Sequence, residues 1–190
     1  MDVKRCWGSK DDLARDYHDD DWGTPVYDEK VLFEFIILEG AQAGLNWMTI
    51  LRRREGYRRA FDGFDFNKIA KYDEKKVESL LQDEGIIRNK LKVNSAILNA
   101  KVFLEIRKEF GSFSDYIWGF VDNKPINNKF KSWKEVPATT EISDNISKDL
   151  KKRGMKFVGS TIIYAFMQAV GMVNDHLVDC FRYKEIVANY

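Results

Sequence analysis

The chain has 190 residues, 44% of them hydrophobic, and its 31 basic and 30 acidic side chains leave a formal charge of +1. This composition excludes a disordered chain, and the length favours one domain over residues 1–190, with room for two lobes. Because no apolar run approaches the ~18 residues that cross a bilayer and the polar start is no secretion signal, we expect a cytoplasmic protein without a membrane partner.

In the first half of the chain, hydrophobic patterning predicts two helices. A dense apolar run over residues 31–38 indicates a largely buried helix with Asp28 as its N-cap, loosened after Gly40. The segment TILRRREGYRRAF follows as a second helix, with an apolar face opposite five arginines. Such a basic face is either a solvated helix surface, which is the commoner case, or a phosphate contact.

The second half is also predicted to be helical. Helical periodicity covers residues 74–85 and the longer segment 89–111, and each segment ends at a glycine. The pattern weakens over about 112–140, which we interpret as a connector. Residues 143–171 then give a helix, the six-residue turn GMKFVG and another helix. Because β-type alternation is nearly absent, the predicted fold class is all-α.

The cysteines and histidines of the chain form two pairs, Cys6 with His18 and His176 with Cys180. Two Cys and two His are an established ligand set for structural zinc, and the spacing of the second pair predicts two ligands on one face of a helix. The alternative is two buried thiols and two unrelated imidazoles. The pattern favours one closed structural zinc site that ties the chain ends together in a reducing compartment.

The turn between the last two predicted helices is a candidate phosphate site. A helix that begins directly after a glycine turn, as at Gly159 and Ser160, presents unpaired N–H groups and the positive end of its dipole. The same turn carries Lys151, Lys152, Arg153 and Lys156. Because the net charge is near zero, DNA would have to meet a local basic face of this kind. The alternative is an ordinary αα-hairpin turn without a ligand.

A second candidate site combines aromatic and acidic residues, namely Tyr17, Trp22, Glu39 and Trp47. The long apolar run before Glu39 carries its carboxylate to a partly buried position, where it needs a partner. One acid among aromatic walls suits a flat, cationic or hydrogen-bonding heterocycle. The alternative places the aromatic residues in the core and Glu39 at the cap of a neighbouring helix.

Four stretches carry a family resemblance: RCWGSKDDLARDYHDDDWG, LEGAQAGLNWMTILRRRE, LLQDEGIIRNKLKV and LKKRGMKFVGSTIIYAFMQAVGMVNDHLVDC. They resemble the bacterial 3-methyladenine DNA glycosylase I family, which belongs to the helix-hairpin-helix superfamily of DNA glycosylases. The resemblance implies an all-α monomer that removes 3-methyladenine from double-stranded DNA, with the helix-hairpin-helix at about 143–171. It also implies one structural zinc, held by Cys6, His18, His176 and Cys180.

The resemblance further implies how the damaged base is bound. The flipped base would lie in a pocket formed by Tyr17, Trp22 and Trp47, with Glu39 as the catalytic glutamate. An adenine alkylated at N3 is positively charged and already a good leaving group. Selective binding of the cationic base, by stacking and by Glu39, can therefore account for much of the catalysis. Water would be the final nucleophile.

The same resemblance assigns residues to the DNA. Gly44 and Leu45 would enter the space that the base vacates, while Lys156, Gly159 and Ser160 would hold the DNA backbone. Many superfamily members have a lysine just after the hairpin, where this chain has Ser160 or Thr161. Schiff-base lyase activity is therefore not expected.

Three matters stay open in the sequence. Asp175 lies near the position of the superfamily aspartate, and we favour a capping role or an orienting role beside His176 over a catalytic one. A zinc-stabilised module that binds damaged DNA without catalysis is the first alternative function. A small-molecule binding protein that keeps only the aromatic cleft is the second.

Overall fold

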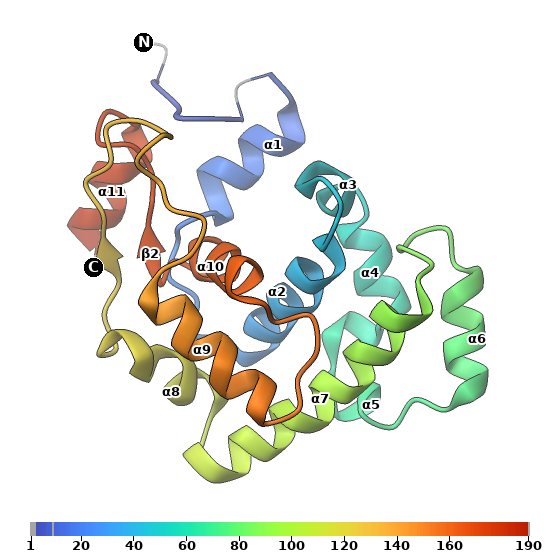
Figure 1. Cartoon of the computed structure of the whole chain (residues 1–190). Helices are drawn as coiled ribbons and strands as arrows, with labels where there is room; N and C mark the ends of the chain where they lie inside the picture. The colour runs from blue at the N-terminus through green and yellow to red at the C-terminus, as the bar shows by residue number, and fades with distance from the viewer. Residues whose placement is uncertain (1–2, 9, 190) are drawn as a thin grey trace.

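The computed structural model describes residues 3–8 and 10–189 as a mostly helical protein (Figure 1). The α-helices are α1 (Asp12–Asp16), α2 (Glu29–Gln42), α3 (Trp47–Leu51), α4 (Arg54–Ala60), α5 (Phe66–Ile69), α6 (Glu74–Gln82), α7 (Lys90–Phe110), α8 (Phe113–Trp118), α9 (Glu141–Lys152), α10 (Ser160–Ala169) and α11 (Phe181–Asn189). Shorter helical segments are the π-helix η1 (Tyr17–Asp21) and the 3-10 helices η2 (Asp62–Phe64) and η3 (Gly119–Val121). Among the described helices, none is long and apolar enough to cross a membrane. The predicted helical class is confirmed.

A short parallel strand pair departs from the all-α prediction. Strands β1 (Ile126–Asn127) and β2 (Val173–Asn174) pair Ile126 with Val173 and Asn127 with Asn174. Each strand has only two residues, too few for alternation to show in the sequence. The pair joins the segment after α8 to the segment after α10, which are far apart in the chain.

Helix α2 runs through the centre of the molecule (Figure 1). Asp28 caps its start as predicted, because its side chain accepts a hydrogen bond from the Val31 N–H at 2.9 Å. All residues from Leu32 to Ala41 are buried, since α3, α7, α8 and α10 pack around this helix. A helix that is apolar all round belongs in a core. Its last turns therefore deliver Glu39 to the interior.

The predicted arginine-rich helix is two helices, α3 and α4, and its basic face is largely paired with carboxylates. Arg52 contacts Asp11 at 2.7 Å. Arg54 and Arg58 both contact Glu34, at 2.5 and 2.9 Å, and the Glu34 side chain is only 7% exposed. Three of the five arginines are thus paired with carboxylates, and the buried pairing with Glu34 gives this region a structural role.

The second half follows the predicted order with one addition. Helix α7 ends at Gly111, whose φ of +89° is the conformation that favours glycine at a helix end. The predicted connector 112–140 contains α8, η3 and β1, which its weak periodicity did not indicate. Helices α9 and α10 pack on each other across the turn 153–159, and α10 also packs on α2. The turn is thereby fixed relative to Glu39.

The pairing of Glu34 predicts a specific stability effect. Glu34→Gln removes the buried charge between Arg54 and Arg58 and is expected to lower the free energy of unfolding by about 3 kcal/mol in urea titrations. The matched control is Glu55→Gln, because the Glu55 side chain also contacts Arg58 but is 68% exposed. The control should change stability by about 0.5 kcal/mol or less. Equal losses in the two variants would contradict this account of the α3–α4 region.

Candidate metal centre and adjoining cavity

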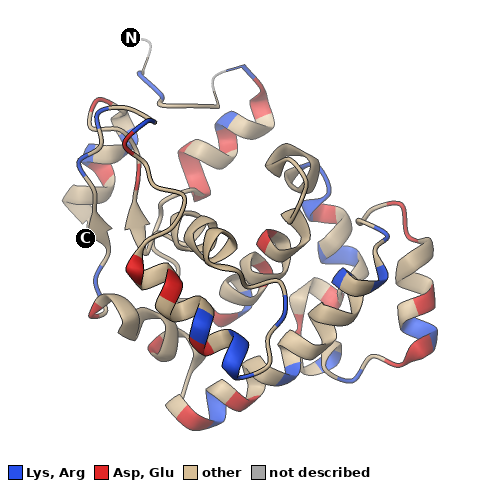
Figure 2. Cartoon of the chain, viewed as in Figure 1, with Lys and Arg blue, Asp and Glu red and all other residues tan. Residues whose placement is uncertain are grey.

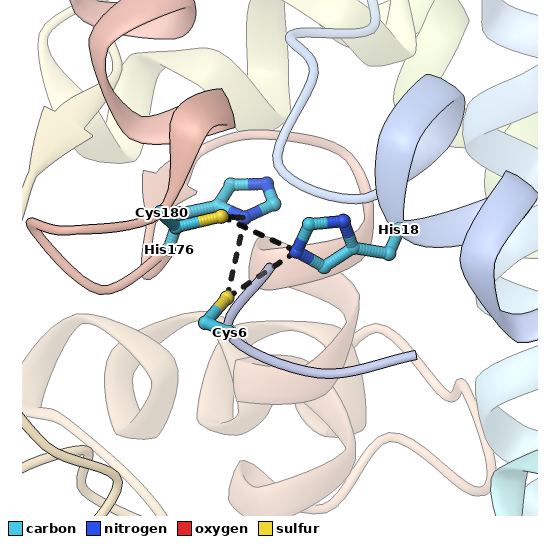
Figure 3. A group of neighbouring side chains, drawn as sticks. All are labelled: Cys6, His18, His176 and Cys180. Atoms are coloured by element: carbon cyan, nitrogen blue, oxygen red, sulfur yellow. Dashed lines mark hydrogen bonds between the residues drawn. The ribbon is translucent and has the colours of Figure 1, made fainter. Parts of the chain in front are cut away.

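Four potential ligand atoms converge although they come from opposite ends of the chain (Figure 3). The Cys6 Sγ lies 3.3 Å from His18 Nε2 and 3.6 Å from His176 Nδ1. The Cys180 Sγ lies 3.5 and 3.6 Å from the same two nitrogens. A tetrahedral zinc, with Zn–S of about 2.3 Å and Zn–N of about 2.05 Å, would separate S and N by about 3.6 Å. The donor set fits zinc.

Each histidine of the cluster uses its other ring nitrogen for a fixed hydrogen bond. His18 Nδ1 lies 2.7 Å from Asp19 Oδ1, and His176 Nε2 lies 2.9 Å from the Trp22 carbonyl oxygen. Because a carboxylate and a carbonyl oxygen only accept, both of these nitrogens carry a proton. The lone pairs of His18 Nε2 and His176 Nδ1 are therefore left for the cluster, which is the arrangement that a metal ligand needs.

The second ligand pair is not helical. His176 and Cys180 lie in a turn between β2 and α11, and α11 begins only at Phe181. The prediction of an i, i+4 pair on a helix is therefore wrong, although the two side chains do converge. The reason is the extended backbone of β2, whose pairing with β1 ends just before His176.

The π-helix η1 orients two of the predicted pocket residues. The Trp22 N–H donates to the Tyr17 carbonyl at 2.9 Å, which is the i to i+5 bond of a π turn. Residues five apart on an α-helix would point about 140° apart. The wider turn lets Tyr17 and Trp22 line the same cavity while His18, between them, reaches the cluster.

A cavity of about 400 Å³ lies beside the cluster. Its volume falls within the range of about 300–1,000 Å³ that is usual for ligand pockets. The lining residues are Trp7, Tyr17, Trp22, Glu39, Gln42, Trp47, Trp133, Ala165 and Gln168. The structure thus brings together all four residues of the predicted aromatic and acidic site.

Two polar groups in this cavity have no protein partner. The Glu39 side chain is buried, with the residue 4% exposed, and neither its Oε2 nor the Trp47 Nε1 has a hydrogen-bond partner within the described chain. Burial raises the pKa of Glu39 to about 8. Burial, together with the nearby Glu39, also raises the pKa of the Tyr17 hydroxyl. Because an unpaired buried polar group costs about 1–3 kcal/mol, a ligand that pairs with these groups gains binding free energy.

The aromatic walls of the cavity rest on the metal-ligand cluster. The Trp22 ring lies 4.6 Å from the His176 ring between centroids, and the Trp7 ring lies 5.1 Å from that of His18, both edge-on. The cluster and the cavity therefore share a wall, so the position of each histidine constrains an aromatic side chain.

The turn between α9 and α10 presents part of the predicted DNA-contacting set. Gly154 has φ +105° and needs glycine, whereas Gly159 has φ −63° and caps α10 without a side chain. Figure 2 shows basic residues at the end of α9 and in this turn, where Lys156 is exposed. Arg153 is instead paired with carboxylates of α7 and α9, and the Ser160 hydroxyl bonds to Ser143 and to an aspartate of α9.

The loop between α2 and α3 carries the other predicted DNA-contacting residues. Gly44 has φ +75° and Leu45 is 40% exposed at the loop tip. The Lys92 Nζ donates to the carbonyls of Ala41 and Ala43 at 2.7 and 2.8 Å. A cation at these carbonyls stabilises the C-terminal end of α2, so the loop leaves the helix in a fixed direction.

The methyladenine glycosylase family model matches residues 7–183 of the chain. The chain belongs to this family. It is 49% identical over 182 residues to the DNA-3-methyladenine glycosylase 1 of Escherichia coli (strain K12), covering 95% of this chain and 97% of that protein. It is 48% identical over 177 residues to the DNA-3-methyladenine glycosylase of Haemophilus influenzae, covering 93% and 96%.

Solved structures of the family have the same fold. A crystal structure of 3-methyladenine DNA glycosylase I matches with a TM-score of 0.91 at 49% identity, covering 94% of this chain and 98% of that one. A structure of 3-methyladenine DNA glycosylase I from Staphylococcus aureus, solved to explain 3-methyladenine recognition, gives 0.90 at 34% identity, covering 93% and 94%. The resemblance drawn from the sequence motifs is confirmed.

Several cavity residues of this family member were not predicted from the sequence. Trp133 lies in the predicted connector, lines the cavity and donates from Nε1 to the Cys6 carbonyl at 3.0 Å. The sequence feature that could have indicated Trp133 is that it is a single tryptophan within the polar run KFKSWKEVP. Trp7 could have been found because it adjoins Cys6. Gln168 lies on the buried-looking helix α10 and gave no signal of its own.

The raised pKa of Glu39 predicts how stability depends on pH. The unfolded chain ionises Glu39 near its ordinary pKa of 4.5, whereas the folded protein keeps the proton up to about 8. Glu39 therefore favours folding fully below pH 4.5 and loses this contribution as pH rises to about 8. Glu39→Gln, which stays neutral, should gain stability relative to the parent at pH 8 and much less at pH 5. Urea titrations at both pH values test this, and a pH-independent difference would contradict the buried carboxyl.

Proposed function

We propose that this protein is a DNA glycosylase that hydrolyses the N-glycosidic bond of 3-methyladenine in alkylated double-stranded DNA. The two relatives that are 48% and 49% identical over nearly the whole chain are DNA-3-methyladenine glycosylases. The observation that carries the assignment to one site is the buried carboxyl of Glu39, unpartnered at Oε2, in a cavity with aromatic walls. Such a cavity suits a flat base removed from the helix stack.

We assign the base-binding roles to the predicted residues. Trp47, Tyr17 and Trp22 provide aromatic faces and edges for stacking and for attraction to a positively charged purine. Glu39 is the proposed catalytic residue. A cationic base in the cavity favours its carboxylate form, which then accepts a hydrogen bond from the exocyclic amino group of the base.

The proposed reaction needs little acid assistance. The bond between C1′ of the sugar and N9 of the base breaks, and its electron pair stays on N9 and cancels the positive charge of the methylated adenine. A water oxygen bonds to C1′ and releases a proton to solvent. None of the described residues that line the cavity is a lysine, so no amine is placed to form a Schiff base. We therefore propose a monofunctional hydrolase.

The DNA is proposed to be held by two loops. Gly44 and Leu45 form an exposed tip that would occupy the gap left by the flipped base. The N-terminal end of α10, at Gly159 and Ser160, and the exposed Lys156 would bind backbone phosphates. On this proposal, residues 143–171 act as a helix-hairpin-helix within one domain of a monomer.

We propose that Cys6, His18, His176 and Cys180 bind one structural zinc. The donor types, their separations and the fixed histidine tautomers support this metal. When bound, zinc would supply cross-linking between the chain ends and no reaction chemistry, because all four positions are filled by protein ligands.

Base release from methylated duplex DNA tests the proposed activity. The parent protein should release 3-methyladenine, and Glu39→Gln should lose about 100-fold in kcat/KM because the charge that faces the cationic base is removed. Glu84→Gln is the matched control, since the Glu84 side chain is 87% exposed. It should act like the parent.

Two outcomes would overturn the proposed activity. Salt-dependent DNA binding without any base release would select a DNA-binding module instead. Release of 3-methyladenine by Glu39→Gln at the parent rate would remove Glu39 from its proposed role.

Metal content tests the proposed zinc. Elemental analysis should find about one zinc per chain, and the double variant Cys6→Ser/Cys180→Ser should lose it together with thermal stability. Chelation of the parent should lower its melting temperature in the same way. Full zinc retention in the double variant would exclude this ligand set.

A further inference from the structure

Asp175 is a buried carboxylate that lies outside the cavity but next to it in structure. It is 0% exposed, and its Oδ2 accepts from the Tyr164 hydroxyl at 2.7 Å and from Gln168 Nε2 at 2.9 Å. Its Oδ1 accepts from Asn128 Nδ2 at 2.7 Å. Its oxygens are thus satisfied by three side-chain donors, and none of the described donors is a helix N–H group, so the capping role expected from the sequence is not seen. Asp175 is also not among the described residues that line the cavity.

This carboxylate fixes the orientation of the Gln168 amide. Because Asn128 and Tyr164 also donate to Asp175, its oxygens act as acceptors, and the end of Gln168 that faces them is the NH₂ group. The other end, Oε1, has no hydrogen-bond partner among the described residues. Since Gln168 lines the cavity and Asp175 does not, Oε1 is the amide atom available to a bound ligand.

A fixed acceptor in this cavity distinguishes purines by the group at C6. Adenine carries an amino group there, which donates, whereas guanine carries a carbonyl oxygen, which only accepts. Glu39 makes the same distinction as a carboxylate, but burial raises its pKa to about 8, and a Glu39 that takes up a proton can donate to a C6 oxygen. Gln168 cannot reverse its role without breaking its bond to Asp175.

We propose that Gln168, held by Asp175, is a specificity-determining residue that selects methylated adenine over methylated guanine by accepting a hydrogen bond from the C6 amino group. This inference rests on the proposed glycosylase function. Glu39 on α2 and Gln168 on α10 line the same cavity, and on this proposal one amino group directs one hydrogen to each of them. A C6 oxygen in the same place would leave both oxygens unpaired, which costs affinity.

The test uses duplex DNA treated with a methylating agent, which carries both 3-methyladenine and 3-methylguanine. The two released bases are separated and quantified from one reaction, so their ratio does not depend on the amount of active protein. Gln168→Met keeps the length of the side chain and removes the acceptor. It should lower the ratio of 3-methyladenine to 3-methylguanine release by about 10-fold or more. An unchanged ratio would overturn the proposal.

Gln42→Met is the matched control, because Gln42 lines the same cavity but no carboxylate of the described residues bonds to its amide. Its ratio should stay within about 2-fold of the parent ratio, whatever its rate. If both variants lower the ratio equally, general polarity of the cavity selects the base, and the specific role of Gln168 is wrong.

Asp175→Asn tests the positioning step. An asparagine can face Gln168 with either end of its amide, so Gln168 loses its enforced orientation and the ratio should fall although Gln168 is intact. Zinc content and melting temperature of this variant are measured alongside, because Asp175 precedes His176. A ratio equal to that of the parent in a folded, zinc-containing variant would overturn the role of Asp175.

A second readout needs no DNA. Quenching of tryptophan fluorescence measures binding of free 3-methyladenine and of 3-methylhypoxanthine, which has oxygen in place of the C6 amino group. The parent should prefer 3-methyladenine, and Gln168→Met should lose that preference.

A parent that releases no 3-methyladenine from DNA would refute the proposed function itself, whereas an active parent with an unchanged variant ratio refutes only the inference about Gln168.

Discussion

The convergence of Cys6, His18, His176 and Cys180 is the contact on which the arrangement of this protein depends. It joins segments separated by more of the chain than any other cluster described above, and the aromatic rings of Trp7 and Trp22 lie edge-on against its two histidines. One wall of the cavity is therefore built on the cluster, while Glu39 enters from the core helix α2. The cluster thus positions the aromatic wall of the cavity, whereas α2 supplies its carboxyl group.

Helix α2 explains why an acid lies in the core. Its apolar surface on all sides drives the whole helix inward, and Glu39 is carried along at the cost of desolvation. Glu34, one turn and a half earlier, meets arginines and is compensated, whereas Glu39 has no such partner. A buried carboxyl without a counter-charge is the kind of local conflict that occurs where a ligand completes the structure.

Features that depend on local sequence patterns could be predicted, whereas features that depend on contacts between distant segments could not. Capping residues and apolar periodicity located α2 and α7, and scarcity of Cys and His located the cluster. The π turn at Tyr17, the strand pair and the position of Trp133 depend on long-range contacts that local patterns do not encode. Gln168 was hidden because its role comes from a carboxylate seven residues away, across the end of a helix.

The joining of distant segments also sets when the cavity can exist. As the chain leaves the ribosome, helices α1 to α10 can begin to form from local contacts, but the Trp22 ring cannot pack against the His176 ring until His176 has been synthesised. A nascent chain that already carries Glu39 and the turn between α9 and α10 would thus lack a complete cavity. The cavity is therefore completed late, only after the chain has been synthesised through Cys180.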